Sequence, residues 1–159
     1  MRRARRGFTL IEAMVAIAVV LVLTAIAVPS FKNASAGSEL RSAATDLVAS
    51  AHLARSEAIK RNTPVTMCVS SDGENCATSG GWEQGWIVRG DTTLRRQASA
   101  QRGLRITAGA ITRVIFQPTG VDATPVAFTV CTTAASEARV VTINTAGRAV
   151  TTKATASCS

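Results

Sequence analysis

The sequence predicts an α+β protein, in which one long N-terminal α-helix is followed by a small β-rich head. Three observations lead to this prediction. An apolar run of 21 residues, 8–28, lies near the start of the chain, and its only polar residues are Thr9, Glu12 and Thr24. A helical pattern of apolar residues then continues to about residue 61. Short β-rich runs separated by turns follow it, and 159 residues leave room for one ordinary domain plus one additional element.

The first seven residues have the composition of a short basic leader. Four arginines precede Gly7 and the apolar run, namely Arg2, Arg3, Arg5 and Arg6. An ordinary secretory signal carries its small-residue cleavage site after the apolar stretch, so it does not explain Gly7-Phe8. The positive-inside rule keeps the arginines in the cytoplasm and places the C-terminal domain outside. We therefore predict a leader, 1–7, and a transmembrane segment, 8–29, with the rest of the chain in the periplasm.

The leader also accounts for half of the net charge. The chain has 18 Lys and Arg, 10 Asp and Glu, and a net charge of +8. Without the four leader arginines, 14 basic residues face 10 acidic ones, which gives +4 and leaves no block of like charge. A polyanionic partner is therefore only weakly indicated by charge.

Glu12 is the unusual residue of the apolar segment. A carboxylate inside a spanning helix costs about 2.5–3.5 kcal/mol on insertion scales, and less near the helix end. Cleavage between Gly7 and Phe8 would create an α-amine one helical turn from Glu12. The amine of a neighbouring subunit could then neutralise the carboxylate in lipid or in a packed filament. The alternative is an acid tolerated near the membrane interface; we favour an assembly role for Glu12.

This N-terminal stretch resembles a known signal. Gly7-Phe-Thr-Leu-Ile-Glu12 before an apolar helix is similar to the class III signal of type IV pilins and type II secretion pseudopilins. The resemblance implies cleavage after Gly7 by a prepilin peptidase, N-methylation of Phe8 and an assembly role for Glu12. It also implies a single-pass protein of the bacterial inner membrane that later enters a pilus or pseudopilus filament.

Residues 30–61 are predicted to form the amphipathic half of the helix. Pro29 interrupts the pattern and predicts a kink, and Asn62-Thr63-Pro64 ends the helix. His52 lies beside the apolar stripe and is interpreted as a helix-surface residue. The stripe recurs at spacings of three and four residues and consists of Leu40, Ala44, Leu47, Val48, Ala51, Ala54 and Ala58.

The remaining segment, 62–159, is predicted to be a head of short strands. A terminal strand at 149–152 could form a hairpin with the preceding strand across the turn 144–147. Trp86 is expected in the core, whereas the place of Trp82, in a loop, stays open. The other expected strands are 65–69, 86–89, 93–98, 104–107, 113–116, 127–131 and 139–143.

Four cysteines follow the apolar segment: Cys68, Cys76, Cys131 and Cys158. A translocated chain reaches an oxidising compartment, where an even number usually indicates disulfides. Of the three possible pairings we favour Cys68–Cys76, which closes a short loop, and Cys131–Cys158, which ties the tail to a strand. Loop-closure entropy would contribute about 2.5 and 3.5 kcal/mol respectively. With no Cys-x-x-Cys pair and a single histidine, no metal site is expected.

Five segments after the apolar run carry a second resemblance: Leu53–Arg61, Val65–Val69, Gly85–Val88, Phe116–Gly120 and Ile143–Arg148. They are similar to the GspH/FimT family of type IV pilin-like proteins, and the similarity covers essentially the whole chain. This family includes type II secretion pseudopilins and minor pilins, and it implies a helix packed on two small antiparallel sheets. The predicted function is a minor type IV pilin that primes and assembles the pilus at its tip, with other minor pilins and the major pilin as partners. The alternative is a type II secretion pseudopilin that supports protein export.

No catalytic constellation is recognisable in the sequence. The chain has one histidine, dispersed carboxylates and no Gly-x-Ser-x-Gly, His-Glu-x-x-His or phosphate-binding loop. We therefore expect no enzyme activity, no catalytic residue, no cofactor and no small-molecule substrate.

DNA is a secondary candidate partner. The resemblance to FimT-like minor pilins implies a C-terminal Gly-Arg-x-Arg motif for DNA, but here Gly147-Arg-Ala-Val150 has valine in place of the second arginine. The tail also has no aromatic residue on which bases could stack. The candidate DNA-binding residues are Arg148, Lys153 and Arg139. A hairpin turn with a solvated arginine is the alternative interpretation of Gly147-Arg148.

Overall fold

The computed structural model describes the backbone of residues 9–100, 103–133, 135–156 and 158, with side chains other than those of 26–34 and 135–136. The chain divides into two compact units between Ser35 and Ala36. The leader, with Gly7 and Phe8, lies outside the described residues, so their processing stays a prediction.

One continuous helix, α1 (Leu10–Arg61, 52 residues), forms the N-terminal part of the fold. This confirms the expected long helix and its end at Arg61, and the assigned helix passes through Pro29 without a break. Asn62, the next residue, has φ = 53°, in the left-handed region that commonly ends a helix. Lys60 and Arg61 place positive charge at the C-terminal end, which favours the helix dipole.

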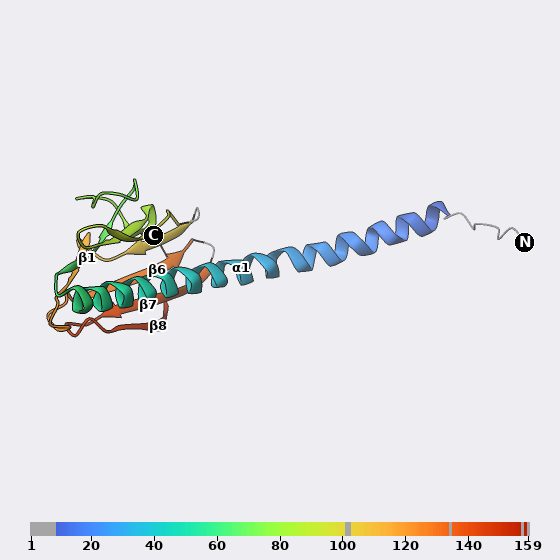
Figure 1. Ribbon diagram of the computed structural model, residues 1–159. Coiled ribbons are helices and arrows are strands. Elements are labelled where there is room, and N and C mark those ends of the chain that lie inside the picture. The colour runs from blue at the N-terminus through green and yellow to red at the C-terminus, as the bar shows by residue number, and fades with distance from the viewer. Residues whose placement is uncertain (1–8, 101–102, 134, 157, 159) are drawn as a thin grey trace, which may run out of the picture. The chain divides into compact units, whose positions relative to one another are not determined.

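Two four-stranded antiparallel sheets make up the head, as the family resemblance implies (Figure 1). Sheet A has the order β3-β2-β1-β5, and sheet B has the order β4-β6-β7-β8. The predicted terminal hairpin is present, and both of its strands are longer than expected from the sequence. The strands are β1 (Val65–Val69), β2 (Trp86–Arg89), β3 (Thr93–Gln97), β4 (Leu104–Thr107), β5 (Arg113–Phe116), β6 (Val126–Thr132), β7 (Ala135–Ile143) and β8 (Ala149–Thr155).

The core of the head lies between the second part of α1 and the inner faces of both sheets. Six residues of the predicted stripe are buried, with at most 2% of their surface exposed, whereas Val48 is only partly buried. His52 is exposed, as expected. Each leucine buried in this way contributes about 1.5–3 kcal/mol. The buried stripe residues are Leu40, Ala44, Leu47, Ala51, Ala54 and Ala58.

Both tryptophans are buried in this core. Trp86 is buried as predicted, and its indole N–H donates to the Ser50 hydroxyl at 3.0 Å. Trp82, left open by the sequence, lies in a short 3-10 helix, η1 (Trp82–Gln84), and only 1% of it is exposed. Its indole N–H donates to the carbonyl of Ile111 at 2.8 Å, and its ring meets that of Phe128 edge-on at 4.8 Å. Its ring centroid also lies 6.5 Å from that of Trp86 in sheet A, so Trp82 packs between the two sheets and is not an exposed aromatic platform.

The predicted disulfides are both present, Cys68–Cys76 and Cys131–Cys158, with Cα–Cα distances of 5.5 and 5.6 Å. Cys68 and Cys131 are buried but stand outside the core cluster, because strand alternation places them on the outer faces of sheets A and B. Each bridge thus fastens a segment to the outer face of its own sheet: the loop 70–77 on sheet A and the C-terminal tail on sheet B.

Candidate assembly surface

The N-terminal part of α1 exposes its apolar side chains. From Leu10 to Leu23, ten large apolar residues each have between 52% and 79% of their surface exposed. A monomeric soluble protein rarely exposes a contiguous apolar patch of this kind, and such patches mark contact with membranes or other proteins. Within the described residues, no helix has both the length and the apolarity that crossing a membrane requires.

Glu12 lies in this exposed segment, in the first turn of the helix. Its backbone N–H donates to Thr9 Oγ1 at 3.4 Å, and the first helical bond runs from Ala13 N–H to the Thr9 carbonyl at 3.1 Å. Thr9 is thus the N-cap, and Thr9-x-x-Glu12 has the sequence of a capping box. The sequence analysis did not identify this role of Thr9, although the Thr-x-x-Glu motif is present in the sequence.

The carboxylate of Glu12 has no ionic or hydrogen-bonding partner among the described residues. A shallow hollow around it is lined by Ile11, Glu12, Val15 and Ala16, so its neighbours on the helix are apolar. The carboxylate is therefore available to a cationic group of another molecule. A helix-initiating role and an assembly role are compatible, because the backbone N–H serves the first and the carboxylate the second.

The three predicted DNA-binding residues do not form one patch. Arg139 pairs in register with Lys153, but only 11% of the Arg139 side chain is exposed, and it donates to Glu137 at 2.8 Å. Arg148 is exposed and lies in the β7–β8 turn, five residues from Lys153, which corresponds to about 17 Å along a strand. Two of the three positions, Arg139 and Lys153, are adjacent, and Arg139 is largely buried.

Gly147, the first residue of the Gly-Arg pair, has a structural role in the turn. Its φ is +68°, and a Cβ there would lie 3.0 Å from Arg55 Cδ and 3.3 Å from the Phe116 ring. The Arg148 backbone N–H donates to Asn144 Oδ1 at 2.9 Å. These contacts account for Gly147-Arg148 as a tightly packed hairpin turn with a solvated arginine.

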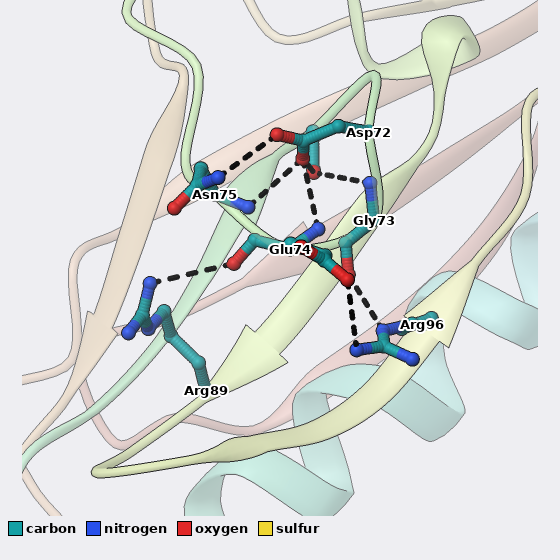
Figure 2. A network of polar contacts seen from close by, with 7 residues as sticks. Asp72, Gly73, Glu74, Asn75, Arg89 and Arg96 are labelled. Atoms are coloured by element: carbon teal, nitrogen blue, oxygen red, sulfur yellow. Dashed lines mark hydrogen bonds and ion pairs between the residues drawn. The ribbon is translucent and has the colours of Figure 1, made fainter.

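The disulfide loop on sheet A is ordered by a polar network (Figure 2). Asp72 accepts hydrogen bonds from the backbone N–H groups of Glu74 and Asn75 at 2.8 and 2.9 Å, and from the Asn75 side chain and the Ser70 hydroxyl at 2.9 Å. These bonds, first of all that from the Asn75 N–H, hold the pKa of Asp72 well below its usual range.

Two arginines of sheet A connect this loop to the strands. Arg96 Nε donates to the Gly73 carbonyl at 2.7 Å, and Arg89 Nη1 donates to the Glu74 carbonyl at 3.4 Å. Figure 2 shows both side chains reaching the loop from the sheet. Sequence reasoning did not single out these arginines, because their common surface arises only from strand pairing. In the part of the chain that the structure describes, no group of three or more His, Cys, Asp or Glu side chains could hold a metal ion.

Comparisons with known proteins agree with the fold. Residues 43–147 match the family model of the type II transport protein GspH, and residues 2–28 match the prokaryotic N-terminal methylation motif. The crystal structure of the Pseudomonas aeruginosa type IV minor pilin FimU is similar, with a TM-score of 0.57 and 23% identity over 71% of this chain and 92% of that one. The Vibrio cholerae minor pseudopilin EpsH aligns with a TM-score of 0.49 and 14% identity over 74% and 97% of the two chains. No match is found among curated protein sequences.

Proposed function

Because this chain belongs to the GspH family of pilin-like transport proteins, we propose that it is a minor type IV pilin that helps prime and assemble the pilus at its tip. One observation carries the proposal: an exposed apolar helical segment contains a single carboxylate, Glu12, that has no partner among the described residues. The match to the N-terminal methylation motif supports the same reading of this segment.

The exposed apolar side chains give the driving force for assembly. Burying one Val, Leu, Ile or Met side chain contributes about 1.5–3 kcal/mol relative to leaving it in water. With ten such residues exposed, the segment gains most by residing in lipid and then packing between other pilin subunits. We propose the inner membrane as its first location, with the head in the periplasm, and other minor pilins and the major pilin as its later contacts.

Glu12 gives this packing its register. A carboxylate in an apolar surrounding needs a cation, because desolvation without pairing is costly. We propose that a prepilin peptidase cleaves after Gly7 and that the freed, methylated amine of Phe8 on a neighbouring subunit pairs with Glu12. One such ion pair at each subunit contact fixes the axial position of each helix relative to its neighbour.

Replacing Glu12 by glutamine tests this role selectively. Glutamine removes the charge but can still occupy the last position of a capping box, so the helix start is kept. We expect Glu12→Gln to reach the membrane normally and to lower the number of assembled filaments at least tenfold, since loss of a buried charge pair costs about 2–5 kcal/mol. Filaments are counted by electron microscopy, and the membrane-bound subunit is quantified by immunoblot.

The matched control is Glu39→Gln, which makes the same change in the same helix but within the second unit. Glu39 lines a surface hollow on the head and stands 27 positions after Glu12 in the sequence. We expect normal filament numbers for this variant. Normal numbers for Glu12→Gln as well would overturn the proposed role of the carboxylate.

A type II secretion pseudopilin is the second candidate, and the description of the matching family favours it. The two candidates differ in what a deletion strain loses. Loss of pili with normal secretion of exoproteins supports the minor pilin, whereas blocked secretion with normal pili supports the pseudopilin. DNA binding is left out of the proposal, because Arg139 is largely buried and Arg148 is separated from Lys153.

A further inference from the structure

A polar pocket lies on the outer face of sheet A, beside the disulfide loop. It has a volume of about 410 Å³. Thr66 of β1 lines it between Arg89 of β2 and Arg113 of β5, and Asn75 and Cys76 of the loop line its edge. These residues all belong to the head, and none of them has a role in the function proposed above.

Strand register explains why two arginines meet here. Thr66 pairs with Arg89 on one side, and Cys68 pairs with Arg113 on the other. Thr66 and Cys68 alternate with the core residues of β1, so both arginines belong to the outer face. An offset of two strands and two residues separates their Cα atoms by about 12 Å, from a strand spacing of about 4.8 Å and a rise of about 3.4 Å. The guanidinium groups can therefore approach one bound group from opposite sides.

The positive charge of the pocket is not balanced by the protein. No Asp or Glu is among its lining residues. Arg113 is exposed and has no ionic or hydrogen-bonding partner in the described part of the chain. Arg89 gives one N–H to the Glu74 carbonyl, which orients the side chain and leaves other donors open.

The acidic side chains near the pocket either bind other groups of the protein or lie outside the pocket. Asp72 accepts its hydrogen bonds within the loop, and the Glu74 carboxylate pairs with Arg96 at 3.8 Å (Figure 2). Asp91 is exposed beyond Gly90 and does not line the pocket. An anion entering between the two arginines would therefore meet no carboxylate among the lining side chains.

We propose that Arg89 and Arg113 form a binding site for the phosphate group of a small ligand. A phosphate ester carries a charge of about −1.5 to −2 at neutral pH, which matches two guanidinium groups. Its oxygens also point in several directions, so one phosphate can accept hydrogen bonds from donors on two sides. A carboxylate has two oxygens on one edge and is suited to a single arginine fork. The ligand is free phosphate or a phosphate ester such as a lipid headgroup.

The site is tested on the full-length chain in a non-ionic detergent, by calorimetric titration with inorganic phosphate at low ionic strength. We expect saturable binding, and about tenfold weaker binding for Arg113→Gln and for Arg89→Gln, because each removes charge-assisted hydrogen bonds. Arg113→Gln is the decisive variant, since this side chain makes no hydrogen bond or ion pair in the described structure. Arg41→Gln, an exposed helix arginine, makes the same charge change and should bind like the parent.

Two further titrations distinguish the source of the phosphate. Binding of glycerol 3-phosphate that is tighter than binding of inorganic phosphate supports an ester ligand, and the reverse order supports free phosphate. The proposal is overturned if inorganic phosphate shows no saturable binding, if Arg113→Gln binds like the parent, or if acetate at equal ionic strength binds as tightly. None of these results depends on filament assembly, so this site and the proposed function fail separately.

Discussion

The two parts of α1 belong to one continuous helix and have opposite surroundings. From residue 10 to 23, large apolar residues are more than half exposed, whereas the stripe from Leu40 to Ala58 is almost completely buried. The sequence already separates the two parts, because the first is apolar on all sides and the second has one apolar stripe, and helices in proteins are stabilised mostly by packing of such a face. The second part is specified by the sheets of the same chain. The first part exposes its apolar side chains, as the function proposed above requires.

Truncating one leucine in each part gives the largest expected contrast. Leu47 is fully buried and Leu21 is 64% exposed. We expect Leu47→Ala to lower the free energy of unfolding of the head by about 2–5 kcal/mol, because it leaves a cavity in the core. The matched change Leu21→Ala should alter it by no more than about 0.5 kcal/mol. Denaturant titration in detergent, followed by tryptophan fluorescence, measures both, since the only two tryptophans lie in the head.

Equal effects of the two truncations would contradict the stated difference between the two parts of α1. A large effect of Leu21→Ala would mean that the N-terminal segment helps to fold the head, so its exposed apolar surface could not be reserved for partners. A negligible effect of Leu47→Ala would mean that the stripe is not the core of the head.

A smaller contrast comes from one hydroxyl in each part. Ser50 is buried, accepts the Trp86 indole N–H at 3.0 Å and donates to the Asp46 carbonyl at 2.7 Å. Thr24 donates to the Leu21 carbonyl at 2.9 Å on an exposed turn. Ser50→Ala leaves the indole N–H buried without this partner, so we expect a loss of about 1–3 kcal/mol.

Thr24→Ala is the matched control and should change the stability of the head by less than about 0.5 kcal/mol. The same fluorescence titration measures both variants, and the emission of Trp86 provides a second readout at the altered contact. If Ser50→Ala is as stable as the parent, another acceptor must take the indole proton and the hydroxyl is not part of what specifies the helix position.

Local sequence patterns predicted the elements of this fold well. The 3.6-residue stripe, the stop at Asn62-Thr63-Pro64 and the alternating strands depend on neighbours in the chain, and they reappear in the structure. The burial of the Arg139 side chain could also have been predicted from the sequence. It shares its side of β7 with Val141 and Ile143, which are core residues, so period-two alternation argued against an exposed DNA contact.

The features that depend on pairing between distant strands could not be predicted from the sequence. Arg89 and Arg113 are 24 positions apart and meet only because both flank β1. The burial of Trp82 similarly requires the carbonyl of Ile111, 29 positions away. Patterns within one element contain no information on register between elements, so the phosphate pocket and the Trp82 contact required the structure.

The smallest expected effect concerns Glu57, an acidic residue near the C-terminal end of α1. Glu57 accepts from Arg61 Nε at 2.6 Å and lies 3.7 Å from Lys60 Nζ. The hydrogen bond from Arg61, with a smaller contribution from Lys60, lowers the pKa of Glu57 from its ordinary value. A carboxyl whose pKa is lower in the folded than in the unfolded state stabilises the fold above its unfolded pKa, about 4.3. This contribution is lost as the pH falls through the lower, folded value.

The measurement compares the parent with Glu57→Gln between pH 6 and pH 3. We expect the parent to be slightly more stable at pH 6 and the difference to shrink as the pH falls below about 4.3, disappearing once the pH is below the folded pKa, because both chains then carry a neutral group at this position. Arg61→Gln should remove most of this pH dependence, and 0.5 M salt should weaken it, since the pair is near the surface. A difference that stays constant down to pH 3 would show that residue 57 acts through packing and that its charge contributes nothing to the stability of the head.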